Sequence, residues 1–278
     1  PIAAALANVP TANPKLALPI NLFGENRMNS DGFSFAEVPV LSALQADMAP
    51  WLAKNNYFAQ PIVAGEYVRG VHRDLQSPID LNAIGYVEEA DATLVDLALK
   101  VMVGYQPVAA LERAKVLDKV ADLLEAARPK LLALLCREAG KTLPDGLGEV
   151  REAIDFCRYY AVEVREKFSQ PVVLPGPTGE TNELSLHGRG VFVCISPWNF
   201  PLAIFIGQIA AAYAAGNAVI AKPAEQTPLI ASAAVRVLLN AGMASDAIAL
   251  MLGAGETVGA ALVADERVAG IAFTGGTS

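Results

Sequence analysis

Between Gly190 and Ala221 the chain carries no charged side chain, and this uncharged run limits the possible folds more than any other feature. The run is long enough to cross a bilayer as a single helix. However, two prolines and an asparagine interrupt it in the segment PWNFP at 197–201, and its pieces fit a strand, a turn, a helix, a turn and a second strand. We therefore reject a transmembrane span and interpret the run as buried core.

Strands and helices alternate downstream of Gly190. Apolar strands are expected at 191–195, 217–223, 247–252 and 268–273, and helices at 200–214, 227–242 and 256–265. Thr227 is the expected N-cap of the helix at 227–242, and Gly242 follows its last turn. Because each strand is apolar throughout, the pattern predicts an α/β fold, a Rossmann-like parallel sheet with helices on both faces.

The first half of the chain reads as a helical segment that follows an extended connector. Residues 1–40 are rich in Pro, Asn and Gly and show no apolar periodicity. A short helix is expected at 40–54 and a hairpin in PIVAGEYVRG at 61–70. Further helices are expected at 88–103, from Pro107 onward, at 129–140 and at 146–168.

Composition excludes several classes of protein. The 278 residues are 53% hydrophobic, which is ample for a core, and the net charge of −8 argues against nucleic-acid binding. Three cysteines without a CxxC motif and two histidines offer no metal-site spacing, so no metal is expected. The sparse cysteines suit a reducing compartment, and the N-terminus makes a poor signal peptide, so we expect a cytoplasmic protein.

Four polar or glycine-rich motifs follow the four predicted strands: SPWNFP, KPAEQTP, GAGETVG and FTGGTS. Parallel α/β sheets bind ligands beyond the carboxyl ends of their strands, so these motifs predict a ligand site there. The glycines of GAGETVG would let the backbone approach a phosphate, or they serve only the turn. Lys222 and Glu225 would hold the two hydroxyls of a ribose, or they form a surface ion pair.

The PWNFP segment also suggests a catalytic donor. Pro197 and Pro201 stiffen the turn, which fixes the Asn199 amide as an oxyanion needs. The alternative is an asparagine that satisfies the backbone of its own turn. Cys194 lies inside an apolar strand without a histidine beside it, so we interpret it as a buried, inert thiol.

Together, these four motifs in this order and spacing resemble the NAD-binding region of the aldehyde dehydrogenase superfamily, over residues 57–278. LPINLFGENRMNSDG, PIVAGEYVRG, IDFCRYYA and PGPTGETNELSLHGRGVF further resemble the L-glutamate-γ-semialdehyde dehydrogenase half of the bifunctional proline utilization A family. The resemblance implies that residues 1–56 are a connector after a proline dehydrogenase barrel, which binds FAD. It also implies a homo-oligomer, built through linking strands.

The resemblance implies a role for each site residue. Asn199 would be the oxyanion donor, held in a dry site, and Phe200 would flank the aldehyde chain. Glu152 would bind the substrate ammonium, or is only a surface charge. The residues expected to bind NAD are Ile195, Ser196, Pro197, Trp198, Lys222, Glu225, Gly255, Gly259, Phe273, Thr274, Gly275 and Gly276. Gly276 stands where a serine is common, and the Glu225 carboxylate would favour NAD over NADP.

The nucleophilic cysteine and the general-base glutamate of the family follow the FTG motif, whereas this sequence ends at Ser278. We therefore expect this chain to be a fragment of a longer enzyme, and we expect the fragment itself to lack the nucleophile. The longer enzyme would oxidise L-glutamate γ-semialdehyde to L-glutamate with NAD. Two alternatives remain open, namely a non-catalytic module that binds NAD or only packs against a partner, and a dehydrogenase for another aldehyde such as succinate semialdehyde.

Overall fold

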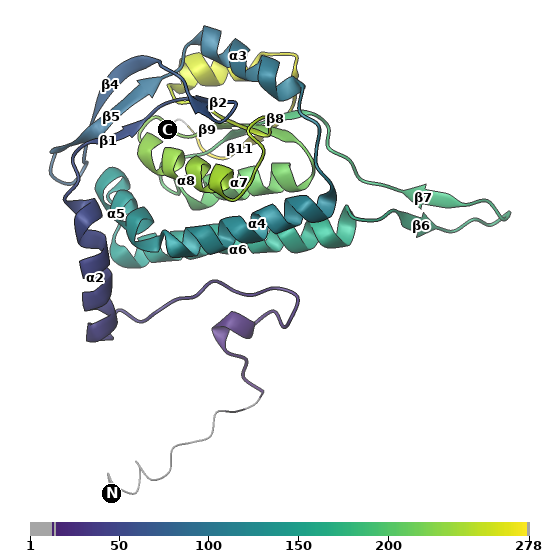
Figure 1. The fold of residues 1–278 in the computed structure, drawn as a ribbon, viewed down its shortest axis with the longest axis horizontal. Coiled ribbons are helices and arrows are strands. Elements are labelled where there is room, and N and C mark those ends of the chain that lie inside the picture. The colour runs from purple at the N-terminus through teal and green to yellow at the C-terminus, as the bar shows by residue number, and fades with distance from the viewer. Residues whose placement is uncertain (1–12, 14, 277–278) are drawn as a thin grey trace, which may run out of the picture.

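The computed structural model describes residue 13 and residues 15–276. The first residues of the expected connector lie outside this range, and they include the segment judged a poor signal peptide. Ser278 also lies outside it. The body is a six-stranded sheet with helices on both faces, joined to a three-stranded sheet, and a two-stranded hairpin projects from it (Figure 1). The described part contains no helix that combines the length and the apolar character needed to cross a membrane.

The large sheet confirms the predicted α/β fold. Its order is β11-β8-β9-β10-β2-β3, and the four strands from the β11 edge to β10 are parallel. These are β8 (Val191–Ile195), β9 (Ala218–Lys222), β10 (Ile248–Leu250) and β11 (Val268–Phe273). The predicted hairpin is also present, as β2 (Ile62–Val63) and β3 (Glu66–Tyr67), and β2 runs antiparallel to β10 at the edge of the sheet.

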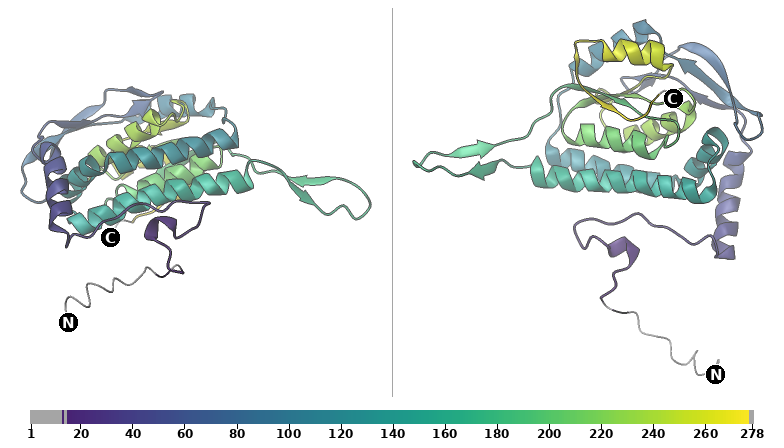
Figure 2. Two further views of the ribbon diagram at one scale, coloured as in Figure 1. Left: turned by 60° about the horizontal axis from the view of Figure 1, so that its bottom comes forward. Right: turned by 180° about the vertical axis from the view of Figure 1, so that it is seen from behind.

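Helices cover this sheet in layers (Figures 1 and 2). One face carries α3 (Ala92–Val103) and α9 (Ala260–Val263), which continues a single π-helical turn at Gly255–Gly259 (η2). The other face carries α7 (Ala203–Ala214) and α8 (Pro228–Asn240). Beyond them lies a second helical layer of α4 (Ala110–Ala126), α5 (Arg128–Ala139) and α6 (Leu143–Lys167).

The expected helix at 88–103 is wrong at its start, because residues 83–89 form a strand. Here β5 (Ala83–Glu89) pairs with β1 (Tyr57–Ala59) and β4 (Val71–Gln76). The helix begins only after Asp91, whose side chain accepts a hydrogen bond of 2.9 Å from the backbone of Leu94. A strand with mixed burial on both faces has no clean period of two, so the sequence pattern did not reveal it.

The projecting hairpin was not predicted either. Its strands are β6 (Val172–Leu174) and β7 (Asn182–Leu184), and it extends far from the body (Figure 1). Val172, Val173 and Leu174 are all exposed, so no packing against the body organises this segment. The strands are held by each other and by a turn in which Gly179 has a φ of 93°.

The N-terminal segment is tied to the body by polar contacts. The 3₁₀ turn at Pro19–Asn21 (η1) precedes an extended stretch. The helix expected at 40–54 is present as α2 (Val38–Leu52), which packs against α5. In the extended stretch, Ser30 is buried, and its backbone N–H and hydroxyl donate to the two carboxylate oxygens of Asp155 at 2.7 and 2.8 Å. The extended stretch around Ser30 is therefore docked on α6.

Candidate functional site

The four motifs meet at the carboxyl edge of the large sheet, around one open cavity of about 700 Å³. The register of the sheet explains this, because Ile195 at the end of β8 pairs with Lys222 on β9 and with Phe273 on β11. The three strands therefore end side by side. The cavity is lined by Ile195, Ser196, Pro197, Trp198, Asn199, Lys222, Ala224, Glu225, Gln226, Gly255, Glu256, Phe273, Thr274, Gly275 and Gly276.

All but one of the residues expected to bind a cofactor line this cavity. The exception is Gly259, which lies behind Lys222. A Cβ atom at Gly259 would sit 3.5 Å from Cε of that lysine. This distance is an ordinary van der Waals contact, so Gly259 packs against the lysine stem without being required there for space. Gln226 and Glu256 are lining residues that the sequence reading did not select.

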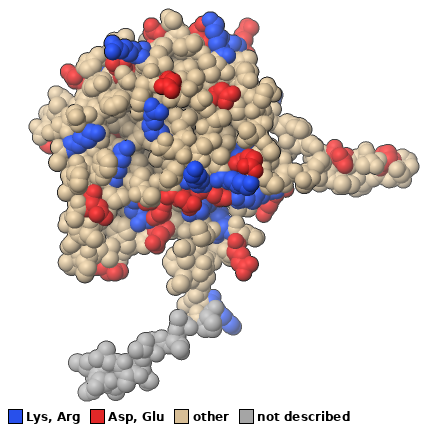
Figure 3. Space-filling model, in the orientation of Figure 1, with Lys and Arg blue, Asp and Glu red and all other residues tan. Residues whose placement is uncertain are grey.

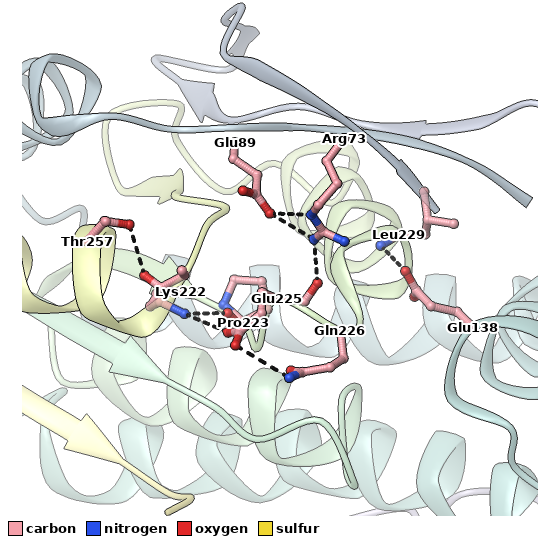
Figure 4. A network of polar contacts seen from close by, with 10 residues as sticks. Arg73, Glu89, Glu138, Lys222, Pro223, Glu225, Gln226, Leu229 and Thr257 are labelled. Atoms are coloured by element: carbon pink, nitrogen blue, oxygen red, sulfur yellow. Dashed lines mark hydrogen bonds and ion pairs between the residues drawn. The ribbon is translucent and has the colours of Figure 1, made fainter. Parts of the chain in front are cut away.

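Lys222 is not part of a surface ion pair, because only 3% of its side chain is exposed. Its Nζ donates to the carbonyl oxygen of Pro223 at 3.0 Å and lies 3.9 Å from a carboxylate oxygen of Glu225 (Figure 4). Burial lowers the pKa of Lys222, and the carboxylates of Glu225, Glu256 and Glu89 oppose that shift. The site therefore presents a buried amine beside a partly exposed carboxylate.

Arg73 on β4 fixes the backbone of the KPAEQTP turn. Its guanidinium donates to the carboxylate of Glu89 on β5 at 2.8 Å and to the carbonyl oxygen of Glu225 at 2.7 Å (Figure 4). The three-stranded sheet of β1, β5 and β4 thus supports the cavity wall that contains Glu225. No sequence signal could have revealed this, since Arg73 lies 152 positions before Glu225.

The PWNFP turn differs from the dry site that was expected. Asn199 is exposed on the wall of an open cavity. Within residue 13 and residues 15–276 its side-chain amide makes no hydrogen bond to the protein, so it is available to a ligand. The neighbouring Ser196 is 3% exposed, and among the described residues its hydroxyl is also unpaired. Two polar groups are thus free to bind a ligand.

The structure does not bring Phe200 and Glu152 into this cavity. The Phe200 ring lies under the Lys141 amine, whose Nζ is 4.3 Å from the ring centroid. Glu152 on α6 lines a separate depression of about 540 Å³ together with Arg27 and Arg151. Burial, and then the nearby Glu149 carboxylate, raise the pKa of Glu152. Glu152 is nevertheless exposed, so the alternative of a simple surface charge stays open.

Cys194 is buried in the middle of the large sheet, as expected. Burial raises its pKa to about 12, which keeps the thiol protonated at neutral pH. A protonated thiol inside a strand is a poor nucleophile. Cys194 is therefore a core residue.

Comparison with known proteins agrees with this arrangement. The model of the aldehyde dehydrogenase family matches residues 69–278. The bifunctional protein PutA of Klebsiella aerogenes is 44% identical over 270 residues, which are 95% of this chain and 20% of that protein. The chain thus spans about a fifth of the length of this curated relative.

Solved structures show the same similarity. A mutant of proline utilization A (PutA) from Bradyrhizobium japonicum superposes with a TM-score of 0.79 at 41% identity, over 94% of this chain and 24% of that one. The 1-pyrroline-5-carboxylate dehydrogenase from Thermus, solved with bound NAD, superposes with a TM-score of 0.81 at 29% identity, over 87% of this chain and 48% of that one. With a family model that covers most of its length and a fold in agreement, this chain belongs to the aldehyde dehydrogenase family.

Proposed function

We propose that this chain is the NAD-binding part of an aldehyde dehydrogenase, and that the longer protein oxidises L-glutamate γ-semialdehyde to L-glutamate. The observation that carries the proposal is the convergence of four strand-end motifs on one cavity that also contains the free amide of Asn199. The names of the relatives support the substrate, since 1-pyrroline-5-carboxylate is the cyclic form of this aldehyde.

The cavity fits NAD in size and in chemistry. Its volume of about 700 Å³ is typical of cofactor sites. Lys222 and Glu225 would hold the adenosine ribose, and the unpaired hydroxyl of Ser196 would bind a second polar group of the dinucleotide. Gly255 and Gly276 leave the backbone open, because a Cβ atom at either would meet nothing within 4 Å. Bound NAD would supply a hydride acceptor.

Asn199 supplies the transition-state donor in this proposal. Its amide would stabilise the oxyanion that forms when a thiolate attacks the aldehyde carbonyl. We propose that the thiolate and the general base belong to a part of the protein beyond these residues. Phe200 would contact the aldehyde chain and Glu152 the substrate ammonium, both from outside the cavity described above.

The longer protein would also oxidise proline, in a proline dehydrogenase domain that binds FAD. The family of bifunctional relatives supports this. Residues 1–56 would then be the connector and residues 57–278 the dehydrogenase part. The β6–β7 hairpin, with exposed Val172, Val173 and Leu174, would join two copies in a homo-oligomer.

Calorimetric titration of the purified chain with NAD tests the binding half of the proposal. We expect saturable one-to-one binding, and weaker binding by a Lys222→Met variant. A folded chain that does not bind NAD would instead favour a module that only packs against a partner. If the chain binds NAD but the complete protein oxidises no aldehyde, the result would favour a non-catalytic NAD-binding module.

The substrate is tested on the complete gene product. We expect kcat/KM for L-glutamate γ-semialdehyde to exceed that for succinate semialdehyde by at least tenfold. The reverse order would identify a dehydrogenase for another aldehyde. Mass spectrometry of the product should show L-glutamate.

A further inference from the structure

Buried glutamates from the outer helical layer cap both helices that follow the first two strand-end motifs. Glu149 on α6 accepts hydrogen bonds from the backbone N–H groups of Leu202 and Ala203, at 2.6 and 3.2 Å, at the start of α7. Glu138 on α5 accepts from Leu229 and Ile230, at 2.6 and 2.8 Å, at the start of α8 (Figure 4). Neither helix has a capping side chain of its own.

Only Glu149 acts next to the PWNFP turn. Leu202, which donates to it, lies three residues after Asn199. At the other end of the turn, the backbone N–H of Ser196 donates to the carbonyl oxygen of Lys222 at 3.2 Å. The turn that carries Asn199 is therefore held at the strand by Ser196 and at the helix by Glu149.

Lys141 completes this support. Its Nζ lies 2.8 Å from the second carboxylate oxygen of Glu149, and both side chains are largely buried. The same Nζ lies 4.3 Å from the ring centroid of Phe200, the residue after Asn199. Charge-assisted hydrogen bonds from backbone N–H groups to a buried carboxylate hold a backbone more firmly than neutral hydrogen bonds do. The pair thus contacts the turn at two points beyond Asn199.

We propose that Glu149, supported by Lys141, is a positioning residue that fixes the Asn199 amide where an oxyanion donor must point. This inference rests on the proposed function, since it assigns Asn199 that role. Asn199 itself is exposed and has no partner among the described residues, so its direction depends on the turn beneath it. A misplacement of about 1 Å in such a site can cost about a hundredfold in rate.

The test compares Glu149→Gln with Glu138→Gln in the complete gene product. Each change replaces one buried carboxyl group in a helix cap with an amide, so Glu138→Gln controls for lost helix stability. We expect Glu149→Gln to lower kcat for aldehyde oxidation by about tenfold to a hundredfold, with the NAD dissociation constant changed by less than about threefold. We expect Glu138→Gln to keep kcat within about threefold. Equal losses of kcat in the two variants, or none in Glu149→Gln, would overturn the proposal.

A second measurement needs no activity. In the 278-residue chain with Trp51→Phe, Trp198 beside Asn199 is the remaining tryptophan. We expect Glu149→Gln to lower the fluorescence anisotropy of Trp198, and Glu138→Gln to leave it unchanged. Unchanged anisotropy in Glu149→Gln would contradict the positioning role, whatever the activity of the complete protein. A complete wild-type protein that oxidised no aldehyde would separately reject the proposed function. If Glu149→Gln fails to fold, Lys141→Gln replaces it, with the same expected loss of kcat and anisotropy.

Discussion

At the scale of single residues, the site is defined by polar groups without partners and by polar groups that are buried. Asn199 is exposed and its amide is free within the described part of the chain, whereas Lys222 is almost wholly buried. A buried amine is costly unless partners or a ligand replace its lost solvation, whereas an exposed amide such as that of Asn199 is hydrated and remains available to a ligand. Both features fit the binding site proposed above.

Asn199→Ala should remove the oxyanion donor without affecting folding. In the complete gene product we expect kcat to fall by about 10²–10³-fold, as for other oxyanion-hole donors. The free energy of unfolding should change by less than about 0.5 kcal/mol, because the side chain is exposed. Steady-state kinetics and chemical denaturation measure the two quantities. Asn240→Ala, at an exposed asparagine at the end of α8, is the matched control and should leave kcat unchanged.

Glu225→Gln should change the choice of coenzyme. Removing the carboxylate beside Lys222 takes away the repulsion that a 2′-phosphate would meet, so NADP should bind about tenfold more tightly, which is about 1.4 kcal/mol. NAD should bind more weakly, since a ribose acceptor is lost. Calorimetry with both dinucleotides checks this. Glu256→Gln removes a second carboxylate from the same cavity and should change both affinities in parallel. A parallel change in Glu225→Gln would contradict its role in selectivity.

At the scale of elements, helix starts are controlled by the neighbouring layer rather than by local caps. Thr227 occupies the N-cap position of α8 as predicted, yet its side chain accepts no capping hydrogen bond, and within the described residues its buried hydroxyl is unpaired. Glu138 from α5 takes over that task. The N-cap rule therefore located the helix start correctly but assigned the wrong capping group.

Glu138 should make folding stability depend on pH. Burial raises its pKa to about 8, although the N–H groups of Leu229 and Ile230 oppose the shift. The folded state then binds the proton more tightly than the unfolded chain, so this contribution to stability is complete below about pH 4.5 and is lost as the pH rises through about 8.

Urea denaturation from pH 5 to pH 8 should therefore show a larger loss of unfolding free energy for the wild type than for Glu138→Gln. The difference should be on the order of a few kcal/mol, since one pKa unit corresponds to about 1.4 kcal/mol. Glu112→Gln, at an exposed glutamate of α4, should follow the wild type. Parallel curves for wild type and Glu138→Gln would show that the carboxyl group is ionised throughout.

At the scale of the whole molecule, charge and shape are unevenly distributed. Acidic and basic side chains form a band over α4 and α6 (Figure 3), which includes ion pairs of Arg158 with Asp122 and of Arg165 with Asp118. The projecting hairpin, by contrast, exposes Val173 with a relative accessibility of 71%. Apolar side chains on an extended arm are typical of a surface that another chain covers.

Val173→Lys should weaken self-association of the complete protein. We expect the mass measured by light scattering to shift toward the monomer, because a lysine would be buried without a partner in the contact proposed for the hairpin. Val71→Lys changes an equally exposed strand valine, at 66%, on the opposite part of the body, and should leave the mass unchanged. An unchanged mass in Val173→Lys would reject the hairpin as the contact.

Local patterns were sufficient for much of the fold. Each of β8, β9, β10 and β11 was predicted within three residues, because a buried parallel strand reads as a short apolar run between turn residues. The motifs after them were expected to meet, and they line one cavity. Strand β5 was missed, since its side chains are partly buried on both faces and show no clear period, and β4 was missed because four of its six residues are exposed.

The sequence by itself determined which residues could build a nucleotide site, since strand ends, glycines and prolines act through the backbone nearby. Only the tertiary structure decided how these residues are held. Arg73 supports Glu225, and Glu149 supports the turn of Asn199, through contacts between segments that are far apart along the chain. It also decided that Asn199 is exposed and Lys222 buried, because burial depends on which layers pack together rather than on the local pattern of residues.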